Sequence, residues 1–372
     1  MKISSFEIIE INVTSKGNWL FVNIHTDVGI SGLGEASQSG NDALVKAALL
    51  QHEAKLIGQD PSNINALWAQ MRDPDAVFSG DAGRVGATAI SAIEQALWDI
   101  KGKALGVPVW QLLGGKYRDE IRIYANLNRG INDRRPEGFA VAAQKATKAG
   151  FSAIKCTPFD EVNHRHQDRD QVQKEIALGV QRVQAVRDAV GPDVDLMVDC
   201  HSRFNLALAQ QVAEALKPFH LYWLEEPVAS DQADAMKLLT QHSGHTLAGG
   251  EAFLKRETFF NAIEQRIMHV LMPDVKHAGG IAECQRIAAL AEVKQMSVSP
   301  HSPAGPISHM AGVHLAAAIP NFLMLEFAFG EVDWRPQFTG PQEMIESGYM
   351  AVPDLPGLGI ELNPEMLNQH RV

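Results

Sequence analysis

The sequence predicts an α/β fold, namely a modified TIM barrel of the (β/α)7β kind, preceded by an α+β capping domain. Short apolar runs of strand type alternate with helical patterns such as ALAQQVAEALKPF and ADAMKLLTQH, as expected for a barrel of parallel strands. Ionisable residues close six successive runs, at steps of 26, 26, 23, 27 and 25 residues. The chain has 372 residues, more than the roughly 250 of a typical barrel, which leaves room for a second domain.

Residues 1–118 are predicted to form the α+β capping domain, because they do not follow the rhythm of the barrel. Residues 1–13 and 18–36 have the pattern of antiparallel strands, with Asp27, Gly29 and Gly32 as turn residues. Residues 86–106 follow with the strongest helical pattern, which stops at a glycine before Val-Pro.

Residues 119–340 are predicted to form the catalytic barrel. Its eight strands are expected at residues 121–126, 152–157, 194–199, 221–225, 246–251, 269–274, 296–301 and 323–327. Residues 341–372 are rich in Pro and Gly and lack a further barrel unit. We therefore expect this C-terminal segment to return to the capping domain.

Composition and charge exclude several classes of partner. The formal net charge of −11 argues against nucleic acid or an anionic membrane surface, although it does not exclude a small carboxylate substrate bound in a cationic cleft. Three scattered cysteines form no disulfide framework. The N-terminal MKISSFEIIEINV has no apolar segment of the kind that signal peptides contain, so we expect a cytoplasmic protein. A homo-oligomer is also expected.

Three carboxylates on adjacent predicted strands form the strongest candidate site. Asp199, Glu225 and Glu251 each close a strand, and they are 26 residues apart at each step. In a parallel barrel the strand ends meet at one face, where catalytic groups gather. An all-oxygen set of ligands suits Mg²⁺ better than Zn²⁺ or copper. The spacing therefore predicts a magnesium site.

Two further strand ends offer a general base. His301 and Asp274 lie on neighbouring strands, so the carboxylate can orient the imidazole and raise its basicity. A structural histidine before a Ser-Pro turn is the alternative, which the strand-end position disfavours. His201 lies two residues beyond Asp199, so strand alternation turns it toward the same side. Lys155 ends the second strand and can neutralise a substrate carboxylate.

Two alternatives stay open at this point. His201 could be a surface loop residue, and Lys155 could be an ion-pair partner of Glu326 or Asp199.

The motifs of the whole chain resemble those of the enolase superfamily, mandelate racemase subgroup, and within it acid-sugar dehydratases similar to D-galactonate dehydratase. The motifs that carry this resemblance are TDVGISGLGEA, AISAIEQALWDIKGKALGVPVWQLLGG, VDC, LEEP, GGE, PDVKHAGGI, SPHSPAGPISH and PDLPGLGIEL. The resemblance implies that the three carboxylates bind Mg²⁺ and that Glu226, the second acid of LEEP, does not. It also implies that His301 with Asp274 is the base, that His201 in DCHSR is a general acid, and that Glu326 lies beside the enolate.

One departure from the family pattern separates the candidate activities. Racemases and cycloisomerases of this subgroup carry Lys-x-Lys on the second strand, whereas this chain has Lys155-Cys156-Thr157. A threonine is no base at neutral pH, so a two-base proton transfer is disfavoured. The expected reaction is a dehydration: His301 removes the C2 proton of an aldonic or aldaric acid, and loss of the 3-hydroxyl gives a 2-keto-3-deoxy sugar acid. The alternatives are a racemase, epimerase or cycloisomerase of the same superfamily and a non-catalytic ligand-binding barrel.

Recognition of the substrate is expected between the two domains. The candidate substrate-binding residues are Lys155, Thr157, Arg203 and Trp334. The resemblance implies that the segments 14–19 and 73–84 act as a lid over the site.

Overall fold

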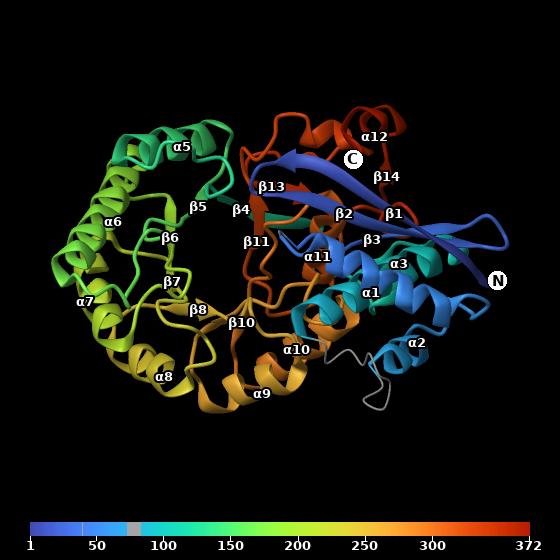
Figure 1. Ribbon diagram of the computed structural model, residues 1–372, viewed down its shortest axis with the longest axis horizontal. Coiled ribbons are helices and arrows are strands. Elements are labelled where there is room, and N and C mark those ends of the chain that lie inside the picture. Colours follow the sequence, from blue (N-terminus) through green and yellow to red (C-terminus); the bar gives the residue numbers. More distant parts are fainter. Residues whose placement is uncertain (39, 73–82) are drawn as a thin grey trace.

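The computed structural model describes residues 1–38, 40–72 and 83–372. Parallel strands curl into a ring with helices on its outside, and a small antiparallel sheet with its own helices lies against one side of that ring (Figure 1). Both ends of the chain lie on the side of the small sheet (Figure 1). Among the described residues, no helix is long and apolar enough to span a membrane.

The ring is the predicted barrel. Its strands are β4 (Glu120–Asn126), β5 (Ala153–Cys156), β6 (Asp195–Asp199), β7 (Trp223–Glu225), β8 (Leu247–Gly249), β9 (Val270–Leu271), β10 (Ser297–Val298) and β11 (Leu325–Ala328). They pair in parallel in the order β10-β9-β8-β7-β6-β5-β4-β11. A single parallel bridge, Val298 to Phe322, joins the two ends of this curled sheet. All eight predicted strands are present, although most are shorter than predicted.

Each of the first seven barrel strands is followed by a helix, and β11 is not, which confirms the (β/α)7β expectation. These helices are α5 (Pro136–Lys148), α6 (Arg169–Val190), α7 (Leu206–Leu216), α8 (Ala233–His242), α9 (Arg256–Gln265), α10 (Ile281–Val293) and α11 (Pro306–Ala318). A one-turn 3-10 helix, η1 (Lys217–Phe219), follows α7. All thirteen residues of α11 are buried. The mostly apolar and small residues of its sequence, PISHMAGVHLAAA, explain how it fits between the barrel and β3.

The N-terminal region forms the expected antiparallel sheet covered by helices. Its elements are β1 (Ile3–Thr14), β2 (Gly17–Thr26), β3 (Ser31–Glu35), α1 (Asp42–Leu56), α2 (Ile64–Met71), α3 (Gly83–Leu105) and α4 (Val109–Leu112). Gly32, expected in a turn, instead lies inside β3. A Cβ there would lie 2.2 Å from Ala96 O, and one at Gly34 would lie 1.8 Å from Ala92 O. These two glycines therefore allow α3 to pack directly on β3.

The C-terminal segment contacts both regions. Its elements are β13 (Tyr349–Ala351), β14 (Glu361–Leu362) and α12 (Pro364–His370), and η2 (Arg335–Phe338) and β12 (Thr339–Gly340) come directly before it. β13 pairs antiparallel with β4 of the barrel. Leu358 N donates to Asp99 Oδ1 of α3 at 2.8 Å, and Val372 N donates to Glu10 O of β1 at 2.9 Å. The segment thereby ties the barrel to the N-terminal sheet.

Candidate active site

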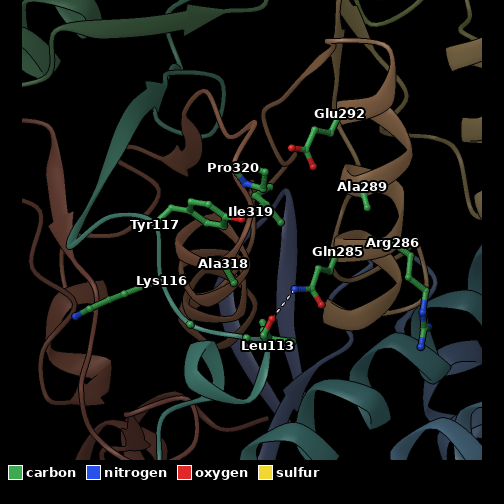
Figure 2. Close-up of a pocket in the computed structure, with 12 residues that line it drawn as sticks. Leu113, Lys116, Tyr117, Gln285, Arg286, Ala289, Glu292, Ala318, Ile319 and Pro320 are labelled. Carbon is green, nitrogen blue, oxygen red and sulfur yellow. Dashed lines mark hydrogen bonds between the residues drawn. The ribbon is translucent and has the colours of Figure 1, made fainter.

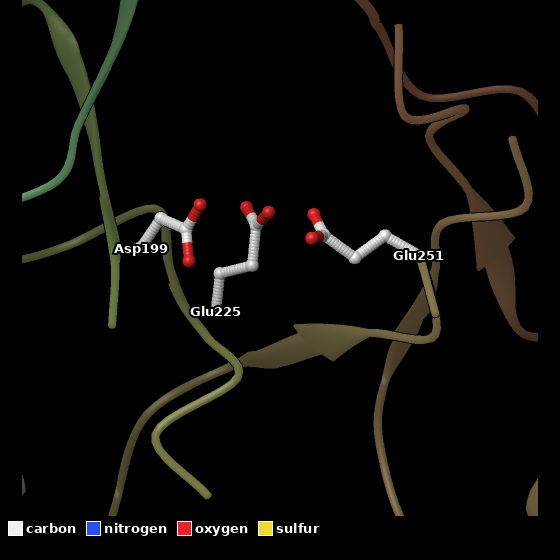
Figure 3. Close-up of side chains that lie close together, drawn as sticks. All are labelled: Asp199, Glu225 and Glu251. Atoms are coloured by element: carbon white, nitrogen blue, oxygen red, sulfur yellow. The ribbon is translucent and has the colours of Figure 1, made fainter. Parts of the chain in front are cut away.

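The three predicted metal ligands come together at the carboxyl ends of adjacent strands. Asp199 and Glu225 end β6 and β7 in direct register, and Glu251 follows β8. One oxygen from each lies within 4.8 Å of the others. Figure 3 shows the three carboxylates side by side, with Glu225 between the other two. Asp199 and Glu225 are buried, and Glu251 is partly exposed.

This row of carboxylates fits a hard divalent cation. The donor atoms are all oxygen, which is the set that Mg²⁺ prefers. Glu251 Oε2 is buried and makes no hydrogen bond with the described residues, although His301 Nε2 lies 3.1 Å from it. Burial and the neighbouring Asp199 raise the pKa of Glu225 well above its ordinary value, because like charges crowd one another here. A bound cation would relieve that crowding.

Glu226 lies outside this row. Its carboxylate accepts hydrogen bonds from Ser230 Oγ at 2.7 Å, Gly250 N at 3.0 Å and Ser202 Oγ at 3.1 Å. These contacts hold the loops after β6, β7 and β8 together. The second acid of LEEP therefore has a structural environment, in keeping with the expectation that it is not a ligand.

Lys155 is a buried cation beneath the row. Its Nζ lies 2.7 Å from Glu225 Oε1, 2.9 Å from Glu326 Oε1 and 3.8 Å from Asp199 Oδ2, and its side chain is 1% exposed. Burial alone would lower the pKa of Lys155, but the carboxylates of Glu225 and Glu326 hold it well above its ordinary value. The structure thus contains the ion pair with Glu326 that the sequence offered as an alternative, and the contact of Lys155 with a substrate carboxylate stays a prediction.

Glu326 is held from three sides. Besides its ion pair with Lys155, Glu326 accepts hydrogen bonds from Asn126 Nδ2 at 2.6 Å and from Ser302 N at 2.9 Å. Burial alone would raise the pKa of Glu326, but Lys155 and His301 lower it below its ordinary value. Glu326 is therefore an ionised partner of Lys155.

His301 and Asp274 form the expected pair. His301 Nδ1 donates to Asp274 Oδ2 at 2.7 Å, so its Nε2 faces the row of carboxylates. Asp274 also accepts Lys276 N at 2.7 Å and lies 3.2 Å from Lys276 Nζ. Burial would lower the pKa of His301, yet Glu251 and Glu326 raise it above its ordinary value. The geometry is that of an imidazole oriented by Asp274, with its second nitrogen turned toward Glu251.

His201 borders the opposite end of the row. Its Nε2 lies 3.1 Å from Asp199 Oδ2, and its Nδ1 donates to Asp160 Oδ1 at 2.6 Å. The position agrees with the expectation, but the route differs. β6 stops at Asp199, and His201 reaches the site through a turn with φ of 47°, in which its N–H donates to Asp199 Oδ1 at 2.9 Å. Asp199 and the hydrogen bond from Asp160 raise the pKa of His201 to about 12 against the effect of burial.

The remaining candidates have less definite surroundings. Thr157 Oγ1 and Arg203 Nε are buried and have no hydrogen-bond partner among the described residues. Trp334 is half-buried, stacks on His370 with ring centroids 4.0 Å apart, and meets Trp19 edge-on at 5.2 Å.

The first expected lid segment, 14–19, lies over the end of β4. Lys16 Nζ donates there to Asn128 O at 2.7 Å and to Ile131 O at 3.3 Å. Of the second segment, residues 73–82 lie outside the described residues, so its role as a lid stays a prediction.

A different hollow, of about 610 Å³, lies on the outside of the barrel between the 113–117 segment, α10 and the end of α11 (Figure 2). Gln285 Nε2 spans it to donate to Leu113 O at 2.8 Å. Its walls hold none of the predicted catalytic or metal-binding groups, so it belongs to the packing between elements.

Comparison with known protein families decides the family of the chain. Residues 138–366 match the family described as "Enolase C-terminal domain-like", and residues 7–114 match the mandelate racemase/muconate lactonizing enzyme N-terminal domain. This chain belongs to the enolase superfamily. The family resemblance expected from the sequence motifs is thereby confirmed.

Curated relatives within this superfamily are named dehydratases, which are hydro-lyases. The chain is 34% identical to D-xylonate dehydratase of Haloferax volcanii, covering 98% of this chain and 89% of the relative. It is 35% identical to D-galactonate dehydratase of Ralstonia pickettii, covering 94% of this chain and 90% of the relative.

Solved structures of superfamily members share the whole fold. A member from Salmonella Typhimurium matches with a TM-score of 0.89 at 32% identity, covering 99% of this chain and 98% of the other. A mandelate racemase/muconate lactonizing enzyme-like protein from Rubrobacter xylanophilus matches with a TM-score of 0.90 at 32% identity, covering 100% and 98%.

Several partners of the site residues were not predicted from the sequence. Asp160 pairs with His201, Asn126 with Glu326, and Trp223 Nε1 donates to Glu225 Oε2 at 2.9 Å. Asn126 ends the first barrel strand, at the position where other strands carry ionisable residues. A search for all polar residues at strand ends could therefore have found it. Asp160 lies in the loop after β5, four residues past the end of that strand, so the same search would not have found it.

Proposed function

We propose that this protein is a Mg²⁺-dependent dehydratase of a five- or six-carbon aldonic or aldaric acid. The observation that carries the proposal is the symmetry of the two histidines about the carboxylate row. His201 Nε2 lies 3.1 Å from Asp199 at one end, and His301 Nε2 lies 3.1 Å from Glu251 at the other. An elimination needs a base and an acid at neighbouring carbons, and each imidazole has its own orienting carboxylate. The names of the curated relatives support this class of substrate.

In this mechanism, Mg²⁺ bound by Asp199, Glu225 and Glu251 supplies the positive charge that makes a carbon acid next to a carboxylate easier to ionise. His301 takes the C2 proton, and Asp274 stabilises the imidazolium that forms, because the two share a 2.7 Å hydrogen bond.

The other residues complete the elimination. His201 gives its proton to the departing 3-hydroxyl, and Asp160 holds the ring in place for that transfer. The enol that is released tautomerises to a 2-keto-3-deoxy sugar acid. Lys155 and Glu326 form a fixed ion pair below the reacting carbons and keep the charge of the site balanced. Lys155, Thr157, Arg203 and Trp334 are proposed to contact the substrate.

Racemisation and epimerisation are the weaker proposals, because they need a second base. Lys155 is 1% exposed and occupied by Glu225 and Glu326, and the residue two positions on is Thr157. Neither side chain offers a free basic nitrogen on the face of C2 opposite His301.

The test is a screen of mono- and diacid sugars at neutral pH with Mg²⁺. A semicarbazide assay reports 2-keto acid, and proton NMR of the same samples reports C2 epimers. We expect keto acid from at least one stereochemical series and no epimer. Rapid formation of an epimer without keto acid would replace the dehydratase by an epimerase.

A further inference from the structure

The loop that carries the base is held by a residue of the other domain. Glu35 is the last residue of β3 and is fully buried. Its Oε1 accepts a hydrogen bond from Gly305 N at 2.7 Å, and its Oε2 accepts one from Ser308 N at 2.9 Å. Gly305 is the N-cap of α11 and has no side chain to cap the helix. The carboxylate of Glu35 therefore supplies that cap from the N-terminal sheet, four residues after His301.

The rest of this loop is fixed at two further backbone points. Ser302 N donates to Glu326 Oε2 at 2.9 Å, and Ala304 O accepts Arg335 Nη1 at 2.6 Å. Both of those partners come from β11 or the segment after it. Glu35 thus supplies the hydrogen bonds from the N-terminal sheet to the backbone between His301 and α11.

The fit around Glu35 is close. A Cβ added to Gly305 would lie 3.1 Å from each carboxylate oxygen of Glu35 and 3.0 Å from Trp19 Cγ. Ser37 Oγ donates to Glu35 Oε1 at 2.7 Å. No change of rotamer is open to this carboxylate without loss of these contacts, so the position of Gly305 follows the position of β3.

The same strand is also connected to the loop that carries Asp274. Gln95 Oε1 of α3 accepts Glu35 N at 3.2 Å, and Gln95 Nε2 donates to Val275 O at 3.3 Å. Val275 is the residue after Asp274. Through its side chain Glu35 reaches the loop of His301, and through its backbone it is joined to the loop of Asp274.

From these contacts we propose that Glu35 is a positioning residue for the reaction, which sets where His301 presents Nε2 to the substrate. Glu35 makes no hydrogen bond to the carboxylate row; it acts through the hydrogen bonds to the two loops and through its charge, which is near Lys276 in the loop of Asp274. The proposal rests on the proposed function, because it takes His301 as the base.

The test variant is Glu35→Gln, which keeps the shape of the side chain. An amide has one acceptor oxygen, so its NH₂ group must face the N–H of either Gly305 or Ser308, and one of the two caps is lost. Misplacement of a catalytic group by about 1 Å can cost about 10²-fold in rate. We expect kcat to fall about 10- to 100-fold with KM nearly unchanged, and C2 proton exchange in deuterated water to fall by the same factor.

The matched control is Asp99→Asn. Asp99 is equally buried and also accepts two backbone N–H groups, from Leu33 at 2.9 Å and Leu358 at 2.8 Å, but it contacts neither loop of the base. We expect it to lower the melting temperature and to change kcat far less than Glu35→Gln does, because it weakens β3 at Leu33 but leaves both hydrogen bonds of Glu35 to the loop of His301 in place.

Gly305→Ala serves as a second variant because it keeps every charge and its backbone does not require glycine. Gly305→Ala should also lower kcat, by a smaller factor than Glu35→Gln.

A spectroscopic readout separates this proposal from the proposed function. In ¹⁵N-histidine protein, the Nδ1 proton of His301 in its hydrogen bond to Asp274 gives a downfield signal, assigned by its loss in His301→Asn. This signal should shift or broaden in Glu35→Gln and stay in place in Asp99→Asn. An unchanged signal and unchanged kcat in Glu35→Gln would overturn the positioning role. If the wild type dehydrates no sugar acid, the proposed function fails, and the NMR comparison still decides whether Glu35 positions His301.

Discussion

The interior of the barrel and its mouth are built by the same strands but have opposite chemistry. The interior holds a buried, mainly apolar layer that includes Tyr124, Ala153, Met197, Trp223 and Met324. Two residues further along the chain from each of these stand the groups of the site, Asn126, Lys155, Asp199, Glu225 and Glu326. Residues two apart on a strand share a face, so one step along the strand leads from core to site. We call the apolar residues inside the barrel the lower layer and the site residues at its mouth the upper layer. The comparison teaches that the lower layer should govern stability and that the upper layer should govern activity.

Removal of the proposed Mg²⁺ should give the largest effect, and this test concerns the site residues at the barrel mouth alone. Chelation should abolish activity, and added Mg²⁺ should restore it. Asp199→Asn should lower activity about 10³-fold or more, since metal catalysis of this kind contributes several kcal/mol and each 1.36 kcal/mol is a factor of ten. The measurements are keto-acid formation and Mg²⁺ titration by calorimetry. Full activity after exhaustive chelation would exclude a metal role for the carboxylate row.

The two histidines should differ in kind as well as in degree. His301→Asn should lose both C2 proton exchange and dehydration, about 10²- to 10⁴-fold, since it removes the proposed base. His201→Asn should lose dehydration but keep exchange, because proton removal does not need the acid. Proton NMR in deuterated water measures both. Wild-type exchange in His301→Asn would refute the assignment of the base.

A substitution in the lower layer should reduce stability and leave activity nearly unchanged. Met197 lies two residues before Asp199 on β6 and is fully buried. Met197→Ala should cost about 2–5 kcal/mol of the free energy of unfolding, because it leaves a cavity in a packed core. Urea denaturation measures this, and kcat of the folded variant should stay close to wild type. A large loss of kcat without loss of stability would break the division between the two layers.

This division also explains how much of the site the sequence could reveal. Ionisable residues at regular steps predicted the strand ends, so the sequence alone was enough to place Asp199, Glu225, Glu251, Asp274 and His301 together. The sequence offered the ion pair of Lys155 with Glu326 only as an alternative and did not predict its pair with Glu225, because charge pairing depends on side-chain direction and distance. Contacts supplied by loops or the other domain, such as that of Asp160, depend on backbone paths without a fixed period.

The smallest expected effect concerns a histidine outside the barrel mouth. His314 in α11 is fully buried, its Nδ1 accepts Trp110 N at 3.2 Å, and its Nε2 donates to Leu358 O at 3.1 Å. Burial lowers the pKa of His314 to about 4, in contrast to the raised pKa of His301 among carboxylates. A depressed pKa means that the stabilisation is complete above about pH 6.5 and is lost as pH falls toward 4.

His314→Gln should therefore weaken the fall of stability between pH 6.5 and 4, since glutamine keeps one donor and one acceptor and does not titrate there. Melting temperatures across this range test it. An identical pH profile in the variant and the wild type would show that His314 does not contribute to acid unfolding.

The return of the C-terminal segment has a consequence for how the molecule is made. Leu358 and Val372, which bond to α3 and β1, are synthesised only after the whole barrel. Domains generally fold in the order in which they leave the ribosome. Here the first sheet and α3 gain their last backbone partners only after every barrel strand has been translated. We therefore expect folding of the two regions to be completed together, in one cooperative transition.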